Sequence, residues 1–166
     1  MTFIGIDPGV NGGIASIQCE TSLRSGVVEM HSFRDMTLQD IVWLFSRLFG
    51  GGTRPVGQFV MLERVHAMPS TFRGCATSWT LAESYATIKT LLTVYEVPFE
   101  VVLPEKWQTV IGVRIKHTKG KKLEDKVDKK KINREKAQAL FPKVSGITKD
   151  TADALLLAEY NRRTHK

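Results

Sequence analysis

The order of strands and helices along the chain is the feature that most restricts its fold. Three short apolar segments come first, at residues 2–7, 14–17 and 27–33, and turns rather than helices separate the first two. Strands joined this closely pair as antiparallel neighbours. Helical patterns then alternate with two more apolar segments, at residues 58–65 and 99–103, and an intervening helix favours parallel pairing. The chain is therefore predicted to be an α/β protein. Its mixed five-stranded sheet has three antiparallel strands, then parallel strands, with helices on both faces.

The helices are expected at five places. The first begins at a capping box formed by Thr37 and Asp40 and ends at glycines 50–52. A long helix opens at Pro69 and Ser70 and runs to about Tyr95. A short helix surrounds Trp107, and two more cover residues 131–141 and 149–163.

The long helix carries two apolar stripes at helical spacing. One stripe can cover the sheet: Leu81, Tyr85, Ile88, Leu92 and Tyr95. The other has smaller side chains: Cys75, Trp79, Ala82 and Ala86. Either the second stripe is buried in the same core, or it is exposed and suited to self-association.

Length and composition set the class of protein. The chain has 166 residues, of which 42% are hydrophobic and 25% are charged, so we expect a single globular domain over residues 1–166. No apolar run approaches the ~20 residues of a membrane span, and the N-terminus lacks the pattern of a signal peptide. The two cysteines lie far apart, which excludes a cysteine-based zinc site and favours a reduced, cytoplasmic protein.

One segment carries the whole excess of positive charge. The window from Arg114 to Lys136 contains eleven Lys and Arg against four Asp and Glu, and the chain as a whole has a net charge of +7. Such segments bind polyanions. A charged linker that binds nothing is the alternative. We expect residues 114–131 to be a flexible basic segment.

Four acidic residues stand out from the surface charge. Asp7 ends an apolar strand, and Glu63 interrupts another, where a lone buried carboxylate would cost several kcal/mol. If these two strands are parallel neighbours, both acids lie at the same edge of the sheet. Asp150 and Asp153 are three residues apart at an expected helix start, which would place them on one face. Acids in a first helical turn also complement the helix dipole, so this pair has a purely structural alternative.

Carboxylates gathered at one site favour hard divalent cations over zinc. Two such ions can clamp the attacking water and the leaving oxygen of a phosphodiester. Together with a basic segment that binds polyanions, the acids indicate a metal-dependent nuclease.

Several motifs resemble those of the RuvC family of Holliday-junction resolvases. Phe3–Gly9 resembles the family's opening strand, Leu62–Val65 its second acidic strand, and Asp150–Leu155 its closing helix. Pro104–Gln108, and Phe141 with Pro142, resemble phage-encoded relatives. The three acidic motifs occur in the family's order, and the resemblance spans nearly the whole chain.

The resemblance implies an RNase H-like fold, a homodimer, and hydrolysis of two symmetric phosphodiesters in four-way or related branched DNA. It implies two Mg²⁺ ions per site, for which Mn²⁺ would substitute, and no nucleotide cofactor. Asp7 would bridge the ions, Glu63 would bind one, and Asp150 and Asp153 the other. His66 stands where bacterial members have an aromatic wedge, and it would contact DNA or be an ordinary loop residue. The lysines expected on the DNA are Lys116, Lys119, Lys121, Lys122, Lys129, Lys130 and Lys131.

Two alternatives stay open. A related RNase H-like nuclease could act on RNA-containing or other branched substrates, because the fold does not determine the substrate. A DNA-binding module without catalysis could keep the same fold, although the four acids argue against it. The membrane plays no part in any of these functions.

Overall fold

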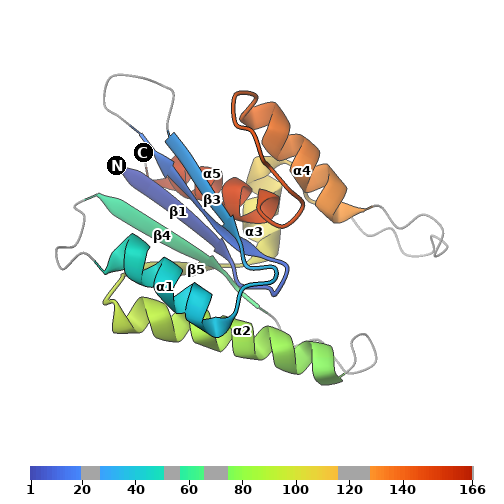
Figure 1. Ribbon diagram of the computed structural model, residues 1–166. Helices are drawn as coiled ribbons and strands as arrows, with labels where there is room; N and C mark the ends of the chain where they lie inside the picture. The colour runs from blue at the N-terminus through green and yellow to red at the C-terminus, as the bar shows by residue number, and fades with distance from the viewer. Residues whose placement is uncertain (20–26, 51–56, 66–74, 116–127, 166) are drawn as a thin grey trace.

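The computed structural model describes residues 1–19, 27–50, 57–65, 75–115 and 128–165. Its central layer is a five-stranded sheet in the order β3-β2-β1-β4-β5 (Figure 1). The first three strands pair in antiparallel fashion, and β4 and β5 run parallel to β1. The predicted mixed sheet is confirmed. The strands are β1 (Thr2–Asp7), β2 (Gly13–Gln18), β3 (Val27–Ser32), β4 (Gln58–Glu63) and β5 (Phe99–Val102).

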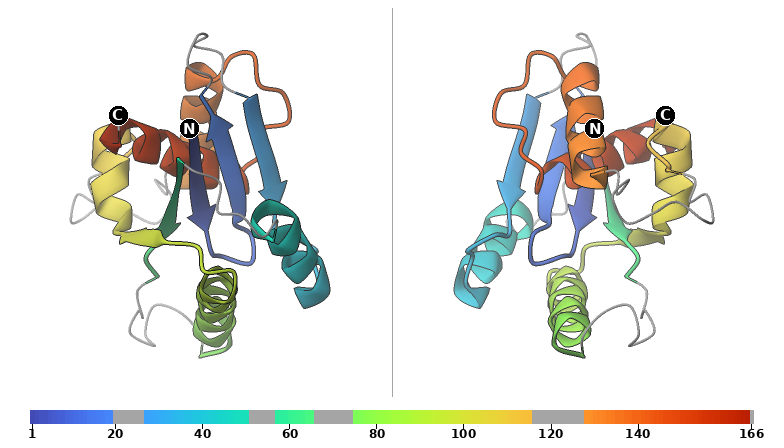
Figure 2. Two further views of the ribbon diagram at one scale, coloured as in Figure 1. Left: turned by 90° about the vertical axis from the view of Figure 1, so that its left-hand side faces the viewer. Right: turned by 90° about the vertical axis from the view of Figure 1, so that its right-hand side faces the viewer.

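Helices cover both faces of this sheet, as expected (Figure 2). They are α1 (Leu38–Phe49), α2 (Cys75–Val94), α3 (Pro104–Ile111), α4 (Lys129–Leu140) and α5 (Ala152–Thr164). One buried cluster joins the sheet to α1 and α2, and a second joins it to α3, α4 and α5. Within the described ranges, no helix is long and apolar enough to cross a membrane.

Local sequence explains where several helices begin. The Thr37 hydroxyl accepts from the Asp40 N–H while the Asp40 carboxylate accepts from the Thr37 N–H, so the predicted capping box is confirmed. Asp128 caps α4 by accepting from the Lys131 N–H. The expected start of the long helix at Pro69 and Ser70 lies outside the described residues.

The two stripes of α2 have different surroundings. Ile88 and Leu92 are buried in the cluster that contains α1, and Tyr85 and Tyr95 pack against it. Trp79, from the second stripe, is 75% exposed, and Ala82 and Ala86 are exposed as well. The second stripe is therefore on the surface of the chain, which decides between the two alternatives left by the sequence.

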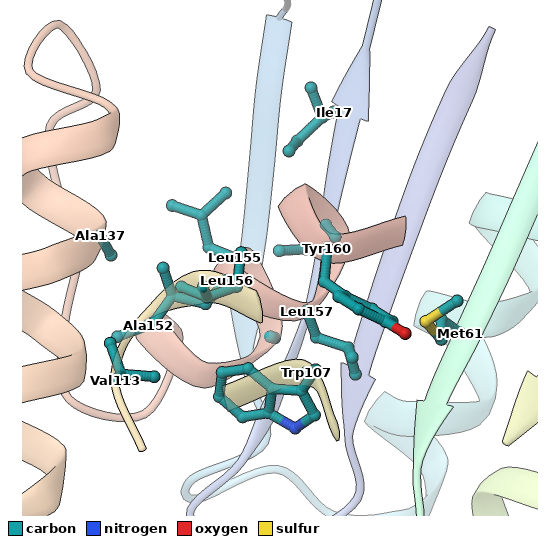
Figure 3. Packing of buried hydrophobic residues seen from close by; sticks show 14 of the residues in the cluster. Ile17, Met61, Trp107, Val113, Ala137, Ala152, Leu155, Leu156, Leu157 and Tyr160 are labelled. Carbon is teal, nitrogen blue, oxygen red and sulfur yellow. The ribbon is translucent and has the colours of Figure 1, made fainter. Parts of the chain in front are cut away.

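Helix α5 is the most deeply buried helix described. Leu155, Leu156 and Leu157 are fully buried, and Figure 3 shows them packed with Trp107 and Tyr160. The close approach of α5 to β1 depends on Gly5, because a Cβ there would overlap the Ala154 oxygen and the Ala158 nitrogen. The absent side chain thus lets α5 lie directly on the strand that ends in Asp7.

The buried Asn161 side chain ties α5 to two neighbouring strands. Its amide nitrogen donates to the Ile4 oxygen on β1 at 3.0 Å and to the Phe59 oxygen on β4 at 2.9 Å. One side chain thus holds α5, β1 and β4 together. These are the three elements that carry the acids discussed next.

Candidate active site

Two of the predicted acids lie side by side at one edge of the sheet. Asp7 is the last residue of β1 and Glu63 is the last residue of β4. The strands are parallel neighbours, with Ile6 opposite Leu62. Both acids line a cavity of about 570 Å³, together with Asp153 from the first turn of α5. The structure therefore brings three of the four predicted carboxylates to one place.

Helix α4 supplies two polar side chains that contact the carboxylates of this cluster. The Lys130 ammonium lies 3.8 Å from an oxygen of Asp7 and 3.7 Å from an oxygen of Asp153. It also donates to the backbone oxygen of Asn11 at 3.0 Å. The buried Asn133 side chain, one turn along α4, donates to Asp153 at 2.7 Å. The beginning of α4 thus places a cation and a hydrogen-bond donor against the carboxylates.

Burial and mutual repulsion raise the pKa values of the clustered acids. Burial is the largest cause for Asp7, followed by the charge of Asp153, and together they raise its pKa to about 6. The pKa of Glu63 is raised well above its ordinary value, first by burial and then by Asp7 and Asp153. Burial also raises the pKa of Asp153, although Lys130 and Asn133 counteract the rise. Such perturbed pKa values in a cavity are typical of functional sites.

Asp150 has different surroundings from the other three acids. It precedes Thr151, the N-cap of α5, so it lies just before the helix, and not in its first turn as predicted. Its carboxylate accepts two hydrogen bonds from the Arg34 guanidinium, at 2.7 and 3.0 Å. These bonds are the main reason that the pKa of Asp150 is lowered. Asp150 does not line the cavity that Asp7, Glu63 and Asp153 share. Its charge nevertheless acts on the cluster, because it contributes to the raised pKa values of Asp7 and Asp153.

The donor chemistry of the cavity fits a hard cation. Among the described residues, the lining contains three carboxylates and neither cysteine nor histidine, and such oxygen donors suit Mg²⁺. In the described part of the chain, no three Asp, Glu, His or Cys side chains stand in the arrangement of metal ligands. The positive charge beside Asp7 and Asp153 is instead the Lys130 ammonium. A metal ion here would take over the charge compensation that Lys130 provides.

The predicted DNA-binding residues are only partly described. Lys129, Lys130 and Lys131 form the first turn of α4. Lys130 faces the carboxylates, whereas Lys131 is exposed and lies 4.0 Å from Glu135. The other predicted contacts lie outside the described residues: His66, Lys116, Lys119, Lys121 and Lys122. Most of the basic segment, whose flexibility stays a prediction, lies outside them as well.

Sequence reasoning missed Arg34, Asn133 and Trp107. Arg34 lies in the turn between β3 and α1, next to Asp35, which adopts a left-handed φ of 62°, and no sequence pattern marks that turn as part of a site. A signal did exist for Asn133, which lies three residues after Lys130, so both point from one side of the helix. Trp107 is fully buried, and its indole N–H makes no hydrogen bond of ordinary length with the described residues. It still lies near enough to Glu63 to counteract slightly the rise in the pKa of that acid.

Comparison with known proteins gives a likeness in structure only. The sequence matches no protein-family model and no curated protein. Among solved structures, RuvC of T. thermophilus in complex with a Holliday junction substrate is similar, with a TM-score of 0.58 and 14% identity. The match covers 99% of this chain and 97% of that one. A second RuvC structure, from Thermus thermophilus, has a TM-score of 0.55 and 16% identity over 99% and 96% of the two chains. The chain therefore has the RNase H-like fold of the RuvC resolvases.

Proposed function

We propose that the protein is a metal-dependent endonuclease that cuts four-way and related branched DNA junctions by hydrolysing two symmetric phosphodiesters. The observation that carries the proposal is the convergence of Asp7, Glu63 and Asp153 on one cavity. The shared fold supports it, because one similar structure holds a Holliday junction substrate. The basic residues at the start of α4, beside the cavity, suit a polyanionic substrate.

The carboxylates would hold two Mg²⁺ ions, with Mn²⁺ as a substitute. Bound ions of this kind polarise a phosphate and make a bound water a stronger nucleophile. Asp7 would serve both ions, and Glu63 and Asp153 would each serve one. Asn133 fixes the orientation of Asp153 by donating to one of its oxygens. Asp150 would contribute to the site only if Arg34 released its carboxylate.

Two cuts in opposite strands of a junction require two active sites related by two-fold symmetry. We therefore propose a homodimer. The exposed face of α2 that contains Trp79, Ala82 and Ala86 is the best candidate for its interface, since large exposed aromatic side chains are enriched at interfaces.

The test is a cleavage assay on synthetic substrates labelled in each strand: a four-way junction, a flap, a fork, a duplex and an RNA–DNA hybrid. With Mg²⁺ we expect paired, symmetric nicks in the four-way junction and little cutting of the duplex. Glu63→Gln serves as the inactive control.

Two other outcomes would overturn the proposal. Efficient cutting of the hybrid would favour an RNase H-like nuclease with another substrate. Tight junction binding without cleavage in Mg²⁺ or Mn²⁺ would favour a DNA-binding module.

A further inference from the structure

A second cavity adjoins the one that holds the carboxylates. It has a volume of about 240 Å³, and we call it the side pocket. Val10, in the turn after β1, and Thr80, on α2, line both cavities. Pro8, the residue after Asp7, lies in the wall of the side pocket. The two spaces therefore meet at a rim only a few residues from a carboxylate of the site.

The lining of the side pocket has an apolar part and a polar part. The apolar part comes mainly from the segment between β3 and α1 and from the start of α1: Phe33, Met36, Leu38 and Ile41. The polar part comes from successive turns of α2: Thr80, Glu83, Ser84 and Thr87. Apolar walls with a few polar groups are typical of sites that bind flat heterocyclic rings.

The size of the side pocket suits a single base. Its volume equals that of roughly eight water molecules at about 30 Å³ each. A phosphate is a poor occupant, because the Glu83 carboxylate would repel it. Among the residues that the structure describes, Glu83 has neither an ion-pair nor a hydrogen-bond partner. It is therefore available to accept a hydrogen bond from a ligand.

We propose that the side pocket receives a cytosine next to the scissile phosphate and that Glu83 accepts a hydrogen bond from its amino group. A carboxylate is a natural acceptor for the exocyclic amino group of cytosine. The Thr80 hydroxyl, at the rim, donates to the Ala76 oxygen at 2.9 Å, so only its lone pairs face a ligand. The inference rests on the proposed function, in which a strand whose phosphate lies at Asp7 would run close to this rim, since Val10 lines both cavities.

A second copy of the chain is a weaker candidate for the occupant. The exposed stripe with Trp79, Ala82 and Ala86 lies on a different side of α2 from Thr80, Ser84 and Thr87, given 3.6 residues per turn. Glu83 lies one turn from Trp79 and so between the two sides. A dimer formed through that stripe would therefore approach the side pocket at Glu83 and leave the wall of Thr80, Ser84 and Thr87 free for DNA.

The first experiment measures the sequence preference of cleavage. A set of junctions carries each of the four bases at the two positions that flank the cut. The wild type should cut at cytosine about ten-fold or more faster than at thymine. Glu83→Gln should bring the two rates close together, because an amide can also donate to a thymine oxygen. Ser84→Phe, which fills the pocket, should remove the preference, and Glu105→Gln, an exposed glutamate on α3, should keep it.

The second experiment does not depend on cleavage. Junctions with cytosine at the flanking position and 2-aminopurine as its stacking neighbour are bound in Ca²⁺, and the fluorescence of the probe rises when the cytosine leaves the stack. We expect a several-fold rise with the wild type and little or none with Ser84→Phe at equal saturation.

The outcomes separate this inference from the proposed function. Equal cleavage at all four bases, a preference for any base other than cytosine, or a preference that survives both variants overturns the side-pocket assignment and leaves the nuclease intact. If no junction is cut, but the fluorescence rise occurs and Ser84→Phe abolishes it, the assignment holds and the nuclease proposal fails.

Discussion

Arg34 and Asp150 lie 116 residues apart in the sequence and are joined by two hydrogen bonds, of 2.7 and 3.0 Å. The pair connects the turn after β3 with the residue before the N-cap of α5. Arg34 is about half exposed, whereas Asp150 is nearly buried. A metal ion and Arg34 would both need the oxygens of Asp150, so the arginine competes with any ion at that carboxylate.

Removing this competitor should strengthen metal binding. We expect Arg34→Gln to raise the affinity for Ca²⁺ several-fold in calorimetric titrations, and we expect no such gain when Asp150→Asn is already present. The loss of stability should be small, because an exposed arginine contributes little to an ion pair. If Arg34→Gln instead weakens metal binding as much as Asp150→Asn does, then the arginine positions the carboxylate for the metal.

Substitution of the carboxylates should separate cleavage from binding. Asp7→Asn, Glu63→Gln and Asp153→Asn should each abolish junction cleavage and change junction affinity little, since phosphate contacts dominate affinity. Asp150→Asn should be severe but leave some activity, because its side chain stands apart from the shared cavity. Gel-shift and cleavage assays on one junction give both quantities. Wild-type cleavage by Glu63→Gln would refute the site assignment.

Because the pKa of Asp7 is raised in the folded protein, replacing this acid with a neutral residue should increase the free energy of unfolding. Between pH 4 and 6 the folded protein holds a proton on Asp7 that the unfolded chain has released, so stability falls as pH rises through this range. In metal-free protein, Asp7→Asn should add roughly 1–2 kcal/mol at pH 7 and nothing at pH 3. Thermal unfolding across pH measures this. Mg²⁺ should raise the Tm of the wild type, and Asp7→Asn should remove most of that rise.

The exposed face of α2 should control assembly. Trp79→Arg places a charge at a side chain that is 75% exposed in the single chain, so the monomer should fold normally while the dimer dissociates. Sedimentation velocity measures the oligomeric state, and circular dichroism checks the fold. Trp43→Arg is a matched control, because Trp43 is similarly exposed, at 65%, on α1. A dimer that persists in Trp79→Arg would place the interface on another surface.

The basic segment should set the salt dependence of junction binding. Each phosphate that the protein neutralises contributes about −0.9 to the slope of log affinity against log salt on duplex DNA. Reversing Lys121, Lys122 and Lys129 to glutamate should therefore flatten the slope. Lys130 must stay in place, because it faces Asp7 and Asp153 and its reversal would also change the metal site. An unchanged slope would show that the segment does not contact DNA.

The fold could be predicted from the sequence because local sequence patterns mark its strands. Alternating apolar segments, short turns and a capping box depend on neighbouring residues, and all of them are present in the structure. The same holds for Asp7 and Glu63, since each ends a strand and parallel strands bring their ends to one edge.

Long-range contacts limited what could be predicted about the site. The partners of Asp150 and Asp153 come from a turn and a helix elsewhere in the chain, Arg34 and Asn133, and no periodicity links these positions. The helix that carries Asp153 begins at Ala152, a few residues later than predicted. That small shift leaves Asp150 outside the helix, where its bonds to Arg34 lower its pKa, whereas burial raises the pKa of Asp153.

The dependence of the site on α5 also has a consequence during protein synthesis. Asp7 and Glu63 are made early, but Asp153 and the helix that packs on Gly5 follow Glu63 by about 90 residues, which takes roughly 5–20 s at ordinary rates of translation. Until then the sheet lacks the helix that covers one face and supplies its third carboxylate. On the proposed function, a growing chain of this protein would therefore be unable to cut DNA until α5 has left the ribosome and docked.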